Sequence, residues 1–130
     1  MSGVNLPVYL ALALGGALGA IARYWMTSGV NHPGQMALPL GTLSVNVLGS
    51  FFIGGLYIYL SERPELSEVY RHLLITGFLG ALTTFSTFSL ETLLLIEQGH
   101  YNTALFNVLS SVMFCLGSAY LGISLAKAFL

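Results

Sequence analysis

Four long apolar stretches alternate with short polar connections along the 130-residue chain. The apolar stretches cover about residues 4–26, 40–60, 73–96 and 103–129. An α-helix needs about 20 apolar residues to cross the hydrocarbon core of a bilayer, and each stretch reaches that length. The pattern therefore predicts an all-α, multi-pass membrane protein with four transmembrane helices. The connections are too short to hold another domain, so we expect a single domain over residues 1–130.

The composition agrees with this class, because 55% of the residues are hydrophobic and 7% are charged. Soluble domains carry about 25% charged residues. Four Lys and Arg residues cannot form a phosphate-binding surface, so nucleic acid is excluded as a partner. The single cysteine, Cys115, excludes an intrachain disulfide and a cysteine-based zinc site. The spans contain no paired carboxylates, no Ser/His/Asp set and no lysine-linked phosphate loop, which argues against an enzyme.

The centre of the third span departs most from the composition of an ordinary transmembrane helix. Five of the seven residues from Thr83 to Ser89 carry hydroxyl groups, and Gly77 and Gly80 precede them. None of the seven is a strong helix former, and such residues are tolerated at membrane depth where they lie inside protein or beside water. We therefore predict a helix that is broken near the bilayer centre. The alternative is a continuous helix in which Ser and Thr bond back to their own carbonyls.

Three polar or charged residues stand out in the apolar stretches. Asn46 lies about two turns inside the second span, and Glu91 lies within the third. Both are costly in hydrocarbon unless bonded, so each either belongs to a pathway or links two helices, with Glu91 protonated in the second case. Arg23 ends the first span beside Tyr24 and Trp25, which is typical of an interface anchor, although a pathway role is the alternative.

Helical spacing places two kinds of side chain next to each other on the third span. Phe85 and Phe88 share one face, and Thr84, Thr87 and Glu91 form a polar stripe beside it. Hydroxyl donors and the positive edges of phenylalanine rings suit an anion, whereas a charged Glu91 would repel one. This face is therefore the first candidate for an anion site.

A second polar stripe follows the fourth span, where Asn107, Ser111 and Cys115 recur every four residues. Four short helices leave little interior space, so a pathway is expected between subunits rather than within one bundle. Gly15 and Gly19 form a small-residue face that lets helices approach closely in lipid. Such faces favour oligomerisation.

The charges outside the spans give a weak orientation signal. Arg63, Arg71 and Lys127 fall on the side of both termini, and Arg23 falls on the other side. The positive-inside rule places the termini in the cytoplasm, but so small a bias allows the chain to insert both ways. No Lys or Arg precedes Arg23, so we expect the first span to be retained rather than cleaved as a signal peptide.

Three motifs resemble those of the Fluc-type (CrcB) fluoride channel family, and the likeness covers nearly the whole chain. They are Gly15–Tyr24, Gly41–Gly49 and Thr76–Glu91, of which the third, TGFLGALTTFSTFSLE, is the most specific. The resemblance implies an antiparallel, dual-topology homodimer in a bacterial inner membrane, with two pores along the subunit interface. Fluoride would leave the cell through these pores passively, down its electrochemical gradient.

The resemblance also implies particular site residues. The backbone carbonyls of Gly80 and Thr83 from two subunits would hold one structural Na⁺ on the dimer axis, since oxygen ligands suit a hard cation. The ring edges of Phe85 and Phe88 would meet fluoride, and the Asn46 amide would donate to it. The other residues implied along the anion pathway are Ser86, Thr87, Glu91 and Ser111, with Arg23 near the pore entrance.

Two rival interpretations come from other classes. A small proton-coupled four-helix exporter has a similar size and dimer, but it needs a titratable carboxylate that faces the substrate, usually in the first span. The first span here has none, and Glu91 is the only carboxylate well inside a span. A structural membrane subunit would not need a hydroxyl-rich span centre or the pair of Asn46 and Glu91, both of which are costly in lipid.

Overall fold

The computed structural model describes residues 5–30 and 38–130, and every regular element in these ranges is helical. The position at which the first span was expected to begin, residue 4, lies outside them. The elements in chain order are α1 (Leu6–Val30), α2 (Leu40–Ser61), α3 (Glu68–Arg71), η1 (His72–Leu79), α4 (Gly80–Leu82), α5 (Phe85–Glu97) and α6 (Tyr101–Phe129).

The described residues form four stretches that are long and apolar enough to cross a membrane, which confirms the predicted class. They are Leu6–Val30, Leu40–Ser61, Glu68–Glu97 and Tyr101–Phe129. The third stretch begins earlier than the apolar pattern indicated, because α3 adds a polar first turn that continues into η1. The first stretch likewise continues four residues beyond residue 26, to Val30.

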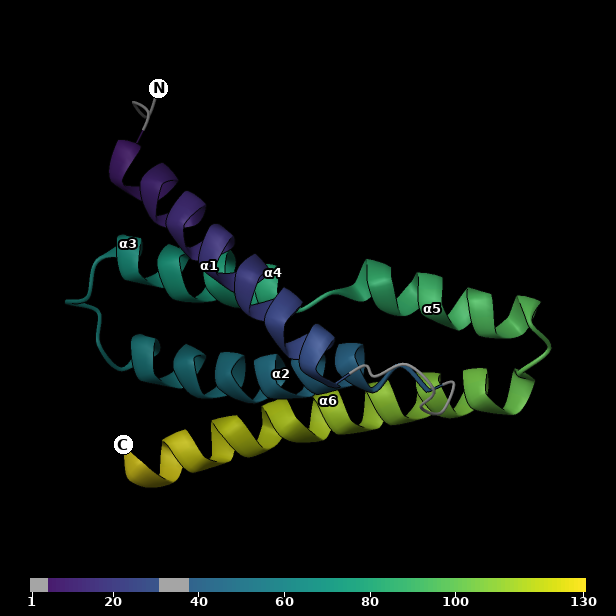
Figure 1. Ribbon diagram of the computed structural model, residues 1–130. Coiled ribbons are helices and arrows are strands. Elements are labelled where there is room, and N and C mark those ends of the chain that lie inside the picture. The colour runs from purple at the N-terminus through teal and green to yellow at the C-terminus, as the bar shows by residue number, and fades with distance from the viewer. Residues whose placement is uncertain (1–4, 31–37) are drawn as a thin grey trace.

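Helices α2 and α6 form the base of the molecule, where they lie side by side (Figure 1). Helix α1 crosses over them diagonally and packs against η1 and α4 (Figure 1). The third span is divided: η1 and α4 lie beside α1, whereas α5 continues away from α1 and lies along α6 (Figure 1). This division places the interrupted segment between α4 and α5 next to both α2 and α6.

The contact between α2 and α6 depends on small residues. A Cβ added at Gly122 on α6 would collide with the carbonyl oxygen of Phe51 on α2. The Ser118 hydroxyl donates to the carbonyl oxygen of Val47 at 2.7 Å, which adds a polar link across the same interface. Close backbone packing and interhelical hydrogen bonds are the forces that hold helices together in lipid.

The glycine face of α1 is used within the chain. A Cβ at Gly15 would collide with the carbonyl oxygen of Leu73, and one at Gly19 with that of Phe78, both on η1. We expected this face to favour oligomerisation, but α1 and η1 already bury it against each other. Gly15 and Gly19 therefore serve packing within the chain.

Element η1 is a π-helix of eight residues, which the sequence pattern did not predict. Turns with i→i+5 hydrogen bonds are rare and occur frequently at functional sites. Here the π-helix leads directly into the short α4 and then into the interrupted segment. The whole stretch from His72 to Thr84 is thus irregular compared with the other spans.

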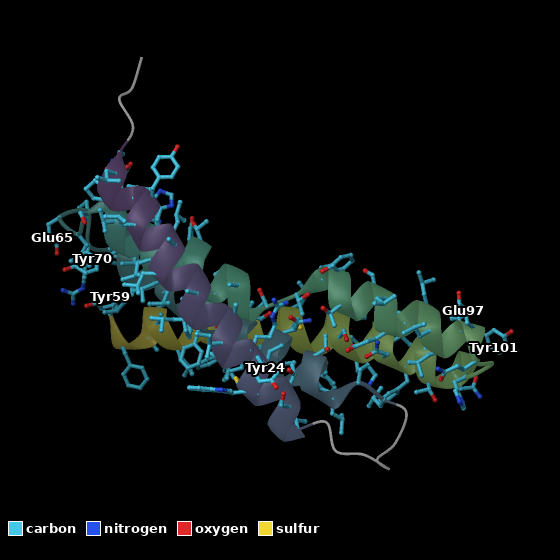
Figure 2. All side chains as sticks on the ribbon, turned by 45° about the horizontal axis from the view of Figure 1, so that its top comes forward. Tyr24, Tyr59, Glu65, Tyr70, Glu97 and Tyr101 are labelled. Carbon is cyan, nitrogen blue, oxygen red and sulfur yellow. The ribbon has the colours of Figure 1, made fainter. Side chains whose placement is uncertain are left out.

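Aromatic and charged side chains gather at the two ends of the bundle. Tyr59, Glu65 and Tyr70 lie at one end, and Glu97 and Tyr101 lie at the opposite end (Figure 2). At the first end, the guanidinium of Arg63 stacks over the Tyr59 ring, 4.5 Å from its centroid. Tyrosines at these positions fit the aromatic belts that mark membrane interfaces.

Candidate functional site: an interrupted span beside an open groove

The helix of the third span is interrupted at two threonines. Helix α4 ends at Leu82, and Thr83 and Thr84 have extended backbone, with φ/ψ of −87°/156° and −153°/116°. Helix α5 begins at Phe85, and the extended connection is visible between α4 and α5 in Figure 1. Its depth relative to the bilayer centre stays a prediction.

Asn46 on α2 pairs with the backbone of Thr84 on both sides. The Thr84 N–H donates to Asn46 Oδ1 at 2.8 Å, and Asn46 Nδ2 donates to the Thr84 carbonyl oxygen at 3.1 Å. The orientation of the amide follows from the partners, because a backbone N–H only donates and a carbonyl only accepts. Asn46 therefore links two helices, and one Nδ2 hydrogen remains for another acceptor.

Thr84 also caps the start of α5. Its hydroxyl oxygen accepts from the Thr87 N–H at 3.2 Å and donates to Thr87 Oγ1 at 3.0 Å. Ser86 Oγ lies 3.4 Å from the same hydroxyl. Thr residues are favoured at this position because the side chain satisfies an N–H that has no helical partner. Ser86 and Thr87, both expected along the anion pathway, thus have their hydroxyls beside the cap of α5.

A groove of about 420 Å³ lies against the interrupted segment, between α2, α4, α5 and α6. It brings together most of the predicted site residues with other small and apolar ones, namely Asn46, Ser50, Gly80, Thr83, Thr84, Phe85, Phe88, Ser111 and Cys115. Four predicted residues are not part of this lining: Arg23, Ser86, Thr87 and Glu91. The groove is where polar donors and aromatic rings meet.

The two phenylalanines lie side by side at the start of α5. Their ring centroids are 5.4 Å apart and the planes are inclined by 50°. Phe85 is 79% exposed although it borders the groove, so one face of the site is open in a single chain. A large apolar ring at this position has either lipid or another protein surface next to it.

Glu91 is held by a residue that sequence reasoning did not single out. The Thr42 hydroxyl on α2 donates to Glu91 Oε1 at 2.8 Å, whereas Glu91 Oε2 is buried without a hydrogen-bond partner in the described part of the chain. Thr42 lies one helical turn before Asn46, so the two share a face of α2. That spacing was the signal that could have identified Thr42.

The polar stripe on α6 divides between two environments. Asn107 is 1% exposed, and its Nδ2 donates to Thr92 Oγ1 at 3.0 Å; the Thr92 hydroxyl donates to the Phe88 carbonyl at 2.7 Å. Ser111 and Cys115 instead line the groove. Asn107 is thus a helix–helix contact, and Ser111 is the stripe residue that the structure brings to the predicted site.

Arg23 lies on α1, which contributes no residue to the groove lining. The side chain is half-buried, and Tyr24 and Trp25 beside it are exposed. The described residues contain no group of three or more His, Cys, Asp or Glu side chains that could hold a metal ion.

These features define a multi-pass α-helical membrane protein whose third span is interrupted beside a groove of hydrogen-bond donors and phenylalanine rings. The chain belongs to the CrcB-like family: residues 10–123 match the family described as CrcB-like protein, Camphor Resistance (CrcB). The match covers the second and third spans in full, including the interrupted segment, and most of the first and fourth.

Several relatives carry the name fluoride-specific ion channel FluC. One from Saccharophagus degradans is 44% identical over 128 residues, which cover 95% of this chain and 92% of the relative. One from Magnetococcus marinus is 49% identical over 116 residues, which cover 89% of this chain and 94% of the relative. One from a Nitratiruptor species is 45% identical over 124 residues, with 95% of each chain covered.

Proposed function

We propose that this protein is a fluoride-selective channel, through which the ion leaves the cytoplasm passively, down its electrochemical gradient. The observation that carries the proposal is the groove in which Asn46, Phe85 and Phe88 meet beside the interrupted span. Relatives that share 44–49% of their residues with this chain bear the name of a fluoride-specific channel, which supports the same function. A bacterial inner membrane is the proposed location.

The anion pathway is proposed to follow the groove. Fluoride is small and strongly hydrated, so a narrow dry path must replace its hydration shell with donors. The remaining Nδ2 hydrogen of Asn46, the Ser111 hydroxyl and the ring edges of Phe85 and Phe88 are such donors. Ser86, Thr87 and Glu91 would border the pathway from outside the groove, and Arg23 would lie near its entrance.

The site is proposed to be completed by a second, antiparallel copy of the chain. The exposed Phe85 ring leaves the groove open on one side, and the small-residue face of α1 is already covered by η1. The weak charge bias, three basic residues against one, allows the two copies to insert in opposite directions. Two copies would then form two pathways along their interface.

A structural Na⁺ is proposed to lie between the two copies, bound by the Gly80 and Thr83 carbonyls. These carbonyls fit the ion, because both residues line the groove and the N–H groups that would bond the carbonyls in a continuous helix donate elsewhere. Interrupted helices in transporters supply free carbonyls to Na⁺ in the same way. Two carbonyls from each copy make four oxygen ligands, and the bound ion would add a fixed positive charge.

The proton-coupled exporter is a weaker candidate. Its carboxylate would have to face the transported substrate, whereas Glu91 is bonded to Thr42 and lies outside the groove lining. The named relatives are ion channels, and we propose no catalytic reaction for this protein.

Fluoride efflux from liposomes tests the channel directly. Purified protein would be reconstituted with internal potassium fluoride, and a fluoride electrode would follow efflux after a K⁺ ionophore is added. We expect rapid efflux of fluoride, no comparable efflux of chloride and no requirement for a proton gradient. Efflux that occurs only with an imposed proton gradient would instead establish the coupled exporter.

A further inference from the structure

Two hydrogen bonds of a continuous third helix are replaced by bonds to side chains. In an α-helix, each N–H bonds the carbonyl four residues earlier. The Thr84 N–H would thus bond the Gly80 carbonyl, but it donates to Asn46 Oδ1 at 2.8 Å. The Thr87 N–H would bond the Thr83 carbonyl, but it donates to Thr84 Oγ1 at 3.2 Å. The two released carbonyls are those of Gly80 and Thr83.

We propose that Asn46 and the Thr84 hydroxyl are positioning groups for the cation site, because they take the N–H groups that would otherwise occupy its carbonyl ligands. The proposal rests on the proposed Na⁺ site and assigns no direct contact between Asn46 and the ion. It gives Asn46 a second task besides donation to an anion. The two tasks use different atoms, since Oδ1 holds the Thr84 N–H and Nδ2 is the donor.

The physical reason is competition for a buried donor. Thr84 is only 8% exposed, and a buried N–H without a partner costs about 1–3 kcal/mol in general. If Asn46 cannot accept a hydrogen bond, the most favourable partner left for the Thr84 N–H is the Gly80 carbonyl. That bond would continue the α4 helix through Thr84. The Gly80 carbonyl would then be shared with that N–H and would bind a cation more weakly.

The Asn46 amide suits this task because it offers an acceptor and a donor together. Oδ1 accepts from Thr84, and Nδ2 donates to the Thr84 carbonyl at 3.1 Å, so both sides of the extended residue are bonded. A hydroxyl would have to make both bonds through one oxygen atom, whereas the amide makes them through two separate atoms. The interruption is thereby held from α2, a different span.

The test is the Na⁺ dependence of thermal unfolding of the purified, detergent-solubilised protein, followed by the fluorescence of Trp25. Na⁺ would be titrated against N-methyl-D-glucamine at constant ionic strength. A ligand that binds only the folded state raises the melting temperature with its concentration, so the half-saturating Na⁺ concentration reports affinity. Fluoride efflux is not needed for this readout.

The decisive variant is Asn46→Leu, and the matched control is Thr92→Val. The control also removes an interhelical hydrogen bond of a buried asparagine, because Asn107 donates to the Thr92 hydroxyl. Thr92 lies outside the interrupted segment. We expect Asn46→Leu to raise the half-saturating Na⁺ concentration by about tenfold or more. We expect Thr92→Val to lower the melting temperature equally with and without Na⁺ and to keep the wild-type affinity.

A second pair of variants applies if Asn46→Leu does not fold. Thr84→Ala removes the acceptor for the Thr87 N–H, and Thr84→Ser retains it. The proposal requires weaker Na⁺ binding in Thr84→Ala and wild-type affinity in Thr84→Ser. Equal Na⁺ affinity in both Thr84 variants, or wild-type affinity in Asn46→Leu, would overturn it.

The outcome separates this proposal from the channel function. If the wild-type protein conducts fluoride but its melting temperature does not change with Na⁺ concentration, the cation site and the positioning role are both overturned. The proposed channel function would still stand. A wild-type protein that responds to Na⁺ but conducts no fluoride would overturn the channel and leave the positioning role standing.

Discussion

Thr42 and Glu91, 49 residues apart in the sequence, are joined by a hydrogen bond of 2.8 Å from the Thr42 hydroxyl to Glu91 Oε1. The bond ties α2 to α5 one helical turn away from the Asn46–Thr84 pair. Because Glu91 Oε2 has no hydrogen-bond partner in the described residues, the Thr42 hydroxyl is the one side-chain partner that they provide for this carboxyl group. The two pairs together fix the second span against the second half of the third.

We expect Thr42→Val to lower the free energy of unfolding by about 1–3 kcal/mol, because the Glu91 carboxyl then loses its hydrogen-bond donor in a buried setting. Valine keeps the shape of threonine, so packing is unchanged. Unfolding in detergent would measure the effect. Ser44→Ala is the control, since the Ser44 hydroxyl donates to the Leu40 carbonyl of its own helix and its loss should have little effect. A Thr42→Val variant as stable as the wild type would contradict the role of this bond.

We expect Phe85→Ile and Phe88→Ile each to reduce fluoride efflux by about tenfold or more, while the assembly of the protein is unchanged. Isoleucine is apolar and fills similar space, but it has no positive ring edge for the anion. Efflux from liposomes, together with size-exclusion chromatography, would separate conduction from assembly. Phe106→Ile, at an exposed ring on α6, is the control and should conduct like the wild type. Unchanged efflux in both site variants would refute the ring-edge role.

We expect Asn46→Asp to divide the two tasks of this residue. Its carboxylate still accepts from the Thr84 N–H, so the half-saturating Na⁺ concentration should stay within about threefold of wild type or fall. The lost amide donor and the added negative charge should reduce fluoride efflux by about tenfold or more. The Na⁺ titration and the fluoride efflux assay, performed on one preparation, would show this difference. Efflux at the wild-type rate would argue that Asn46 is not a donor on the anion pathway.

We expect Gly122→Ala to destabilise the protein by about 1–3 kcal/mol or more, because its Cβ would collide with the Phe51 carbonyl and separate α2 from α6. Gly117→Ala is the matched control on the same helix, since among the described residues no atom outside its own stretch of helix lies within 4 Å of the position its Cβ would take. The control should be neutral or slightly stabilising. Thermal unfolding of both variants would measure the difference, and equal melting temperatures would show that α2 and α6 are not in close contact.

The sequence by itself determined the class of protein and the residues that merit attention. Apolar stretches of about 21 to 27 residues are read directly from composition and length, because hydrocarbon excludes charge whatever the packing. Asn46, Glu91 and the hydroxyl-rich centre of the third span stood out for the same reason: each is costly in lipid unless something bonds it. The three motifs then indicated the family to which the chain belongs.

Only the tertiary structure decided what those residues contact. Asn46 pairs with the backbone of Thr84, Glu91 with Thr42, and Asn107 with Thr92, whereas Gly15 and Gly19 pack within the chain. Spacing along one helix shows which residues share a face, but not how that face is rotated toward its neighbours. That rotation is set by close packing of all the helices together, where one glycine or one hydroxyl decides how near two backbones approach.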